Sequence, residues 1–321
     1  MKIVIAGGTG QLGSVLARGF TDHDHEVRVI GRSVTDPDLR WDGRTAGPWT
    51  QAIDGADVVI NLAGRSVNCR YHWPNLNLMM QSRVDSCLAI GRAIEQARRP
   101  PAVWLQASTA SIYAHTYGPA HTESTGELGG REPNVPAYWA YSVAIARAWE
   151  LAQQSCQTPH TRKVALRLGF TMSPDPGGVF DWLMWLVRHG LGGPFQGGRQ
   201  YVSWITGVDV ARAVTFLVHH ELEGPVNLTA PQPLPNRAFM AHLREAAGVR
   251  WGLPIASWMA EIGAVALRTD TELMAKSRRV QPARLLDAGF AFHRPDWSIA
   301  SQDLVQRWWN LHDAAMDRIE S

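Results

Sequence analysis

The sequence predicts an α/β fold, a doubly wound parallel sheet with a smaller C-terminal α+β domain. Short apolar runs alternate with amphipathic stretches of helical period, as residues 56–64 and 82–97 illustrate. A glycine-rich turn joins the first apolar run to the first helical stretch, and Trp, Gly and Pro become frequent after Thr171. The alternation favours right-handed crossovers and places ligands at the carboxyl ends of the strands. The change in composition indicates a second domain built from insertions.

The first turn of the chain has the pattern of a dinucleotide site. Residues 3–6 form an apolar run with β-branched side chains, which suits a strand buried on both faces. Glycines follow at every third position, where a tight turn, a nearby phosphate and close helix packing each exclude a Cβ. The next helix points its free N–H groups at this turn, so a pyrophosphate is expected there. The expected cofactor contacts in this stretch are Gly7, Thr9, Gly10, Gln11, Leu12 and Gly13.

The second strand predicts which cofactor binds. Residues 26–33 indicate a strand that ends in a basic turn with Arg32 and Ser33, and no carboxylate follows until Asp36. An acidic residue at this position accepts from the ribose hydroxyls of NAD, whereas an arginine pairs with the 2′-phosphate of NADP and stacks on adenine. NADP(H) is therefore favoured over NAD(H), with Arg32 and Ser33 as contacts. The alternative is that Arg32 is an ordinary surface arginine.

The remaining elements complete the predicted sheet. Residues 56–64 form a strand that runs into the turn of Leu62, Ala63 and Gly64, where the backbone would pass close to the cofactor. A polar cluster, residues 108–113, follows the strand at 102–106 and lies at the ligand-binding edge. The other expectations are a short strand ending at 41–43, an irregular segment at 70–80, helices at 82–97, 138–154, 210–220, 236–247 and 257–268, a loop at 117–136, strands at 164–170 and 226–229, and caps at Asn236 and Ser298.

Composition argues against several classes of function. The 321 residues carry a net charge of +2 from 31 basic and 29 acidic residues without a run of like charge, so neither nucleic acid nor a membrane is expected as a partner. Cys69, Cys87 and Cys156 are widely spaced, which argues against a disulfide framework or a zinc site. No metal-ligand spacing is found among the 12 histidines. No leader is expected before the first strand, and the longest apolar stretch, around residues 179–187, is too short and too interrupted to span a bilayer. A cytoplasmic protein is therefore expected.

Several motifs together are more specific than the glycines alone. In the first half they lie at residues 7–13 (Gly-Gly-Thr-Gly-Gln-Leu-Gly), 61–64 and 108–113. In the second half they lie at residues 191–194, 198–200, 203–205, 224–231 and 284–290. Together they resemble the extended short-chain dehydrogenase/reductase superfamily, and within it an epimerase-like branch with a C-terminal domain of unknown function. The resemblance covers the chain to about Leu304 and implies an NADP-binding Rossmann domain with a small domain closing over the nicotinamide.

The resemblance and the composition together predict the domain division. Residues 1–171 and 208–230 form the Rossmann domain, and residues 172–207 and 231–297 form the substrate domain. Residues 298–321 form a C-terminal helix with an apolar stripe that includes Trp308. Trp309 widens this stripe, which makes a homodimer contact an option.

The resemblance also implies catalytic residues. The superfamily uses a tyrosine as general acid/base, a lysine four residues later that lowers the pKa of the tyrosine, and a Ser or Thr that orients the carbonyl. Related sequences place that hydroxyl at Thr109, with Ser108 as its neighbour. Tyr138 and Tyr141 lie where the tyrosine is expected, yet Ser142 and Ile145 stand four residues later. The only lysines are Lys2, Lys163 and Lys276.

Three explanations of the missing lysine stay open. The first is that the enzyme reduces an activated substrate that needs little proton transfer. The second is that another acid, such as Tyr113 or His115, donates the proton. The third is that the chain binds NADPH without turnover. The leading prediction is an NADP(H)-dependent oxidoreductase or epimerase-like enzyme, with hydride passing between the nicotinamide and a small molecule near Thr109 and Tyr141. The alternative is an NADPH-binding sensor or interaction protein. A dehydratase is set aside because Ala110 and Ser111 supply no acidic pair.

Two residues of the second half are expected to contact the substrate. Arg199 is the one strong anion-binding side chain in the glycine-rich stretch 190–200. Trp204 adds flat apolar area, which favours an aromatic or extended ligand. Relatives commonly have histidine and a second acid after Ser-Trp-Ile, where this chain has Thr206 and Val208 and keeps only Asp209. The substrate itself is not identified by the sequence.

Overall fold

A six-stranded parallel sheet lies at the centre of the computed structural model, which describes residues 1–67, 69–133, 135–256 and 272–320. The strand order is β2-β1-β3-β4-β5-β9, and every neighbouring pair is parallel. The strands are β1 (Lys2–Ala6), β2 (Glu26–Ile30), β3 (Val58–Asn61), β4 (Val103–Thr109), β5 (Arg162–Leu168) and β9 (Gly224–Leu228). This order, with the reversal between β1 and β3, confirms the predicted doubly wound fold.

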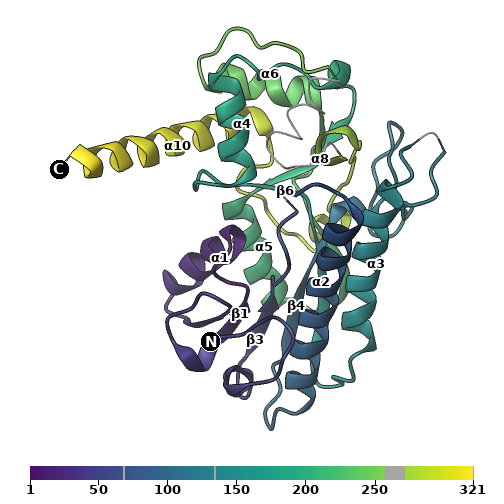
Figure 1. The fold of residues 1–321 in the computed structure, drawn as a ribbon, viewed down its shortest axis with the longest axis vertical. Helices are drawn as coiled ribbons and strands as arrows, with labels where there is room; N and C mark the ends of the chain where they lie inside the picture. Colours follow the sequence, from purple (N-terminus) through teal and green to yellow (C-terminus); the bar gives the residue numbers. More distant parts are fainter. Residues whose placement is uncertain (68, 134, 257–271, 321) are drawn as a thin grey trace.

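Helices cover both faces of the sheet (Figure 1). One face packs on α1 (Gln11–Thr21) and α5 (Gly207–His219), and the other on α2 (Trp73–Glu95) and α3 (Trp139–Ser155). Side chains of β1 alternate between the two cores, because successive residues of a strand point to opposite faces. Ile3 and Ile5 lie in the first core, and Val4 and Ala6 lie in the second.

A third core lies beyond the carboxyl ends of the strands. It joins Phe180 of α4 (Val179–Arg188), Phe239 of α6 (Asn236–Ala246) and Trp297 of α10 (Trp297–Glu320). In Figure 1, α4 and α6 lie at the end of the molecule opposite the N-terminus, and α10 projects away from them. The short elements are β6 (Phe170–Met172), β7 (Tyr201–Val202), β8 (Trp204–Thr206), β10 (Leu234–Pro235), α8 (Glu272–Ala275), α9 (Ala283–Asp287) and the 3-10 turns Pro37–Leu39, Pro48–Ala52, Ala110–Ile112 and Gln196–Gly198.

Helix α2 begins nine residues earlier than expected. The prediction of an irregular segment through residue 80 is wrong from Trp73 onwards. Leu76 and Met79 are buried against Ile145 of α3. Tertiary packing of these apolar side chains therefore outweighs the weak helix signal of the local sequence.

Three smaller expectations are also wrong. Residues 41–43 form no strand, because the Asp42 carboxylate accepts hydrogen bonds from the backbone N–H groups of Arg44 and Thr45 and holds a turn. Asn236 is the first residue of α6 rather than its cap, and it accepts a hydrogen bond from Phe195 N. Helix α10 begins before Ser298, whose N–H and hydroxyl both donate to Asp296. The helix expected at 257–268 lies outside the described residues.

Within the described ranges, no helix combines the length and the apolar character needed to cross a bilayer.

Candidate active site

A cleft of about 750 Å³ opens at the carboxyl ends of β1, β2 and β3. Its wall is completed by α2, through Leu78, Gln81, Ser82 and Asp85. Seven of the eleven residues expected to hold the cofactor line it, namely Gly7, Thr9, Gly10, Arg32, Leu62, Ala63 and Gly64.

The glycine turn at the cleft is built as its spacing indicates. Gly7 has φ +75°, and a Cβ on it would lie 2.9 Å from the backbone of Ala63. A Cβ on Gly13 would lie 2.4 Å from the Cα of Gly8, so only glycine lets α1 pack this closely on the turn. Gly10 caps α1 without a side-chain hydrogen bond, which leaves the first N–H groups of the helix uncapped by any side chain. The turn and the helix end together fit an anionic group such as a pyrophosphate.

The other four expected cofactor residues lie beside the cleft. Gln11 donates to the backbone oxygen of Asp175 at 3.4 Å, and Leu12 packs partly against the first core. Gly13 is buried under the turn, whereas Ser33 is exposed beyond the end of β2.

At the end of the cleft next to β2, a second arginine joins Arg32. Arg44 lines the cleft from the turn that Asp42 holds. Hydrogen bonds from the Thr45 hydroxyl and from backbone N–H groups lower the pKa of the Asp42 carboxyl, so it stays ionised and occupied by this turn. Trp41 packs on Trp49 at 4.8 Å between ring centroids and anchors the loop. Arg44 was not predicted as a cofactor contact, although the Asp-Gly-Arg-Thr turn after Trp41 is a detectable signal in the sequence.

At the end of β4, the two expected hydroxyl residues differ sharply. Thr109 is half-buried, and its hydroxyl oxygen accepts from Ser111 N at 3.1 Å, so its own hydrogen can still be donated. Ser108 is only 3% exposed and donates to Glu150 at 2.6 Å. Glu150 in turn pairs with Arg167 through two bonds of 2.9 and 2.8 Å. Ser108 therefore belongs to a buried network in this structure.

Tyr113, an alternative proton donor, lies in the same network. Its hydroxyl accepts from Arg167 at 2.7 Å and donates to Asn227 at 2.9 Å. Burial raises the pKa of Tyr113, which is only 1% exposed.

Tyr141 lies against α2 and is half-buried. Its hydroxyl donates to Asn77 at 2.7 Å, and its ring meets the edge of Trp73 at 4.9 Å. Ser142 stands four positions after Tyr138 and Ile145 four positions after Tyr141. Ser142 donates to Glu272, and Ile145 packs in the apolar cluster with Leu76.

The segment after α8 brings two cations to the end of β4. Lys276 is 1% exposed and donates to the backbone oxygen of Ser111 at 2.9 Å, and Arg278 donates to the Ser111 hydroxyl at 2.8 Å. Burial lowers the pKa of Lys276 to about 8. His115, the other alternative acid, accepts from Ser277 N at 2.9 Å, and burial lowers its pKa. Neither cation could be predicted here from the sequence, because nothing local links residues 111 and 276.

The two residues expected to contact the substrate have different surroundings. Arg199 is exposed, with its guanidinium 5.5 Å from the ring centroid of Tyr117. Trp204 has no exposed surface; it donates to the backbone oxygen of Gln232 at 3.2 Å and packs on Trp297. In this structure Trp204 is therefore a core residue.

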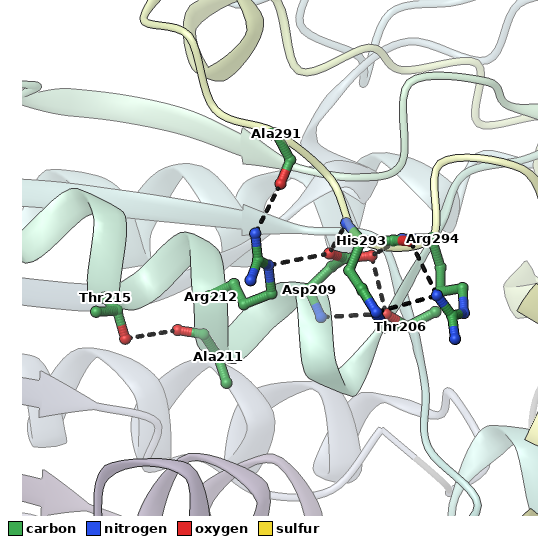
Figure 2. Close-up of polar contacts among 8 residues, drawn as sticks. All are labelled: Thr206, Asp209, Ala211, Arg212, Thr215, Ala291, His293 and Arg294. Atoms are coloured by element: carbon green, nitrogen blue, oxygen red, sulfur yellow. Dashed lines mark hydrogen bonds and ion pairs between the residues drawn. The ribbon is translucent and has the colours of Figure 1, made fainter. Parts of the chain in front are cut away.

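Asp209, near the N-terminus of α5, ties that helix to the segment before α10 (Figure 2). Its fully buried carboxylate accepts from His293 N at 2.6 Å and from Arg294 N at 3.0 Å. Thr206 caps α5 by accepting from Asp209 N at 3.1 Å and donates its own hydroxyl to the carboxylate. This cluster fixes where the C-terminal segment crosses the first core. Among the described residues, no three His, Cys, Asp or Glu side chains are grouped to hold a metal ion.

Curated relatives match most of the chain. The epimerase family protein YfhF of Bacillus subtilis (strain 168) is 26% identical over 95% of this chain and 98% of its own length. SDR39U1 of Homo sapiens is 26% identical over 95% of this chain and 100% of its own length. ML0860 of Mycobacterium leprae (strain TN) is 29% identical over 91% of each chain.

Solved structures share the fold. The crystal structure of human SDR39U1 (isoform 2) with NADPH has a TM-score of 0.81 at 24% identity, covering 95% of this chain and 99% of that one. The UDP-glucose 4-epimerase of Thermus thermophilus, in complex with NAD, has a TM-score of 0.68 at 16% identity, covering 96% and 99%. Residues 257–304 match the model of a domain of unknown function, DUF1731. Residues 3–228 match the model of the NAD dependent epimerase/dehydratase family, and the chain belongs to that family.

Proposed function

We propose that the chain binds NADP(H) in the cleft and transfers hydride between the nicotinamide and a small organic substrate near Thr109 and Tyr141. The observation that carries this proposal is the cleft itself. It has a glycine turn and an uncapped helix end at β1, and two arginines at β2. The two ends suit a pyrophosphate and a 2′-phosphate respectively.

Charge at the β2 end supports NADP(H) over NAD(H). Arg32 and Arg44 both line the cleft there, and the nearby carboxylate of Asp42 is occupied by its own turn. A ribose hydroxyl would need an acceptor at this place, whereas a phosphate needs donors and positive charge. The human relative SDR39U1 was crystallised with NADPH, which agrees with this choice.

Within this site, the chain's own groups bind, orient and hold protons. The bound nicotinamide supplies or accepts the hydride. Thr109 has a hydroxyl hydrogen available for a substrate carbonyl, because its oxygen already accepts from Ser111 N. Tyr141 is the proposed proton donor; its hydrogen is donated to Asn77 in this structure, so the hydroxyl would turn from that amide oxygen to the substrate. The proposed domain division, with residues 172–207 and 231–297 forming the substrate domain, places the substrate between the two parts of the chain.

One observation favours a second function, which is NADPH binding without turnover. The α3 positions that would carry the superfamily's lysine hold Ser142 and Ile145, and these contact other residues. A chain of this kind would act as a sensor or interaction protein.

The cofactor proposal is tested by titrating the protein with NADPH and with NADH while following nucleotide fluorescence. We expect NADPH to bind at least tenfold more tightly, and Arg32→Asp to lose that preference. The matched control is Arg28→Asp, since Arg28 is an exposed arginine that pairs with Glu26 on the same strand. If neither nucleotide binds below millimolar concentration, the proposal is wrong.

Turnover separates the two functions. Oxidation of bound NADPH is followed over a panel of carbonyl compounds, in the wild type and in Thr109→Ala and Thr109→Ser. Sustained turnover that Thr109→Ala reduces and Thr109→Ser retains supports the enzyme. Turnover that Thr109→Ala leaves untouched contradicts the role of this hydroxyl, and tight binding with no turnover supports the sensor.

A further inference from the structure

Arg83 of α2 is a buried cation with few partners. The residue is 9% exposed, and its side chain donates one hydrogen bond, to the backbone oxygen of Met79 at 3.1 Å. Its guanidinium carbon also lies 5.0 Å from the ring centroid of Trp149. A guanidinium carries five N–H donors, and across the described ranges no aspartate or glutamate pairs with Arg83. Burying a cation without a counter-charge is costly, so the arrangement calls for an anion.

The guanidinium lies directly behind the cleft wall. A Cβ built on Gly64 would lie 3.4 Å from the guanidinium carbon of Arg83 and 3.2 Å from its Cγ. Gly64 is exposed and lines the cleft, as does Ser82, the neighbour of Arg83 in sequence. Because Gly64 has no side chain, the Arg83 side chain lies against the Gly64 backbone at the edge of the cleft.

The position of Arg83 along the sheet separates it from both phosphate sites of the cofactor. The proposed 2′-phosphate site lies at β2, and the proposed pyrophosphate site lies at the turn after β1. Arg83 lies farther on, beyond β3 in the order β2-β1-β3-β4, between α2 and Trp149 of α3. It follows Met79 by one helical turn, and Met79 belongs to the cluster against which Tyr141 packs. The charge is therefore on the side of the cleft where the substrate is placed.

We propose that Arg83 binds an oxyanion group of the substrate at Gly64, and that the substrate is a small organic acid. The inference rests on the proposed function and gives it a substrate class. A planar guanidinium binds a carboxylate or a phosphate through two parallel hydrogen bonds, and this one has the unused donors to do so. Arg199, which the sequence singled out for this task, is exposed and lies over Tyr117.

The test measures oxyanion binding by calorimetry, with and without saturating NADPH. The probes are oxalate and inorganic phosphate, whose relative affinities tell a carboxylate from a phosphate. The variants are Arg83→Met, Arg83→Lys, Arg199→Met and the control Arg92→Met, an exposed arginine on the same helix. We expect the wild type to bind one oxyanion per chain, Arg83→Met to weaken it at least tenfold, Arg83→Lys to weaken it less, and Arg92→Met to leave it unchanged. Loss of binding in Arg199→Met with retention in Arg83→Met overturns the proposal.

Stability and cofactor affinity distinguish the remaining outcomes. Methionine keeps the apolar stem of Arg83 and removes the uncompensated charge, so the ligand-free variant is expected to unfold at an unchanged or higher temperature. If Arg83→Met unfolds at a lower temperature than the wild type, and the wild type binds neither oxalate nor phosphate, Arg83 is a structural cation and the proposal is overturned. A tenfold loss of NADPH affinity in Arg83→Met with oxyanion binding retained also overturns it, because Arg83 then contacts the cofactor. A wild type that binds oxalate but not NADPH refutes the proposed function instead.

Discussion

Removing the carboxylate of Glu150 is expected to destabilise the chain strongly. Glu150 and Arg167 form a two-bond ion pair of 2.9 and 2.8 Å, and their side chains are 9% and 7% exposed. In Glu150→Ala the guanidinium of Arg167 stays buried beside β4 without its counter-charge, and Ser108 loses its acceptor. Breaking a buried pair in this way costs about 3–5 kcal/mol of the free energy of unfolding.

The same reasoning predicts that removing both charges restores most of the loss. In Glu150→Met combined with Arg167→Met no charge is buried, and the Tyr113 hydroxyl keeps its bond to Asn227. The exposed pair of Arg28 and Glu26, also 2.8 Å apart, is the control. Breaking it by Glu26→Ala is expected to change the free energy of unfolding by less than about 1 kcal/mol.

Urea unfolding followed by both circular dichroism and tryptophan fluorescence measures these values, and coincidence of the two transitions justifies the two-state treatment. A double-mutant cycle of Glu150→Met, Arg167→Met and the double variant isolates the coupling between the two charges. A loss below about 1 kcal/mol for Glu150→Ala, or a double variant no more stable than the single one, would refute the reasoning.

Three further predictions concern Gly13 in the glycine turn, the buried Lys276, and Asp209, which ties α5 to the segment before α10. Gly13→Ala is expected to abolish NADPH binding in a fluorescence titration, because the new Cβ would lie 2.4 Å from the Cα of Gly8; unchanged affinity would contradict this. Burial lowers the pKa of Lys276 from 10.5 to about 8, so the native chain binds fewer protons than the unfolded chain between these values. Stability from this residue therefore rises with pH, by up to about 3 kcal/mol, and Lys276→Met should lose that rise when unfolding is measured from pH 8 to 10.5. Asp209→Asn turns an amide N–H₂ towards the N–H of His293 or Arg294, so it should destabilise by about 2 kcal/mol in urea unfolding; an unchanged midpoint would contradict it.

The fold class and much of the cleft could be predicted because their signals are local. An apolar run such as residues 3–6 marks a strand buried on both faces, and the structure buries every one of its side chains. Gly7 is required by its φ of +75° and Gly13 by its closeness to Gly8 within the same turn, so their spacing alone marks a tight turn followed by a helix. Arg32 lies two residues after the end of β2, and it lines the cleft because the carboxyl end of that strand opens onto it.

The surroundings of the hydroxyl residues at the end of β4 could not be predicted in the same way. Thr109 and Ser108 are adjacent in sequence and chemically alike, yet one hydroxyl stays available and the other donates to Glu150, 42 residues away. Local sequence cannot tell these neighbours apart, because the difference comes from a partner on another helix.

The sequence by itself determined the parallel sheet, the glycine turn and the basic residue at the end of β2, since periodicity and backbone sterics act between near neighbours. Only the tertiary structure decided where charges are buried. It brings Lys276 to Ser111 across 165 residues, and it places Arg83 behind Gly64 without a carboxylate partner in the described part of the chain. Burial and pairing of a charge depend on segments that meet only after folding, and this is why residue type and spacing do not reveal them.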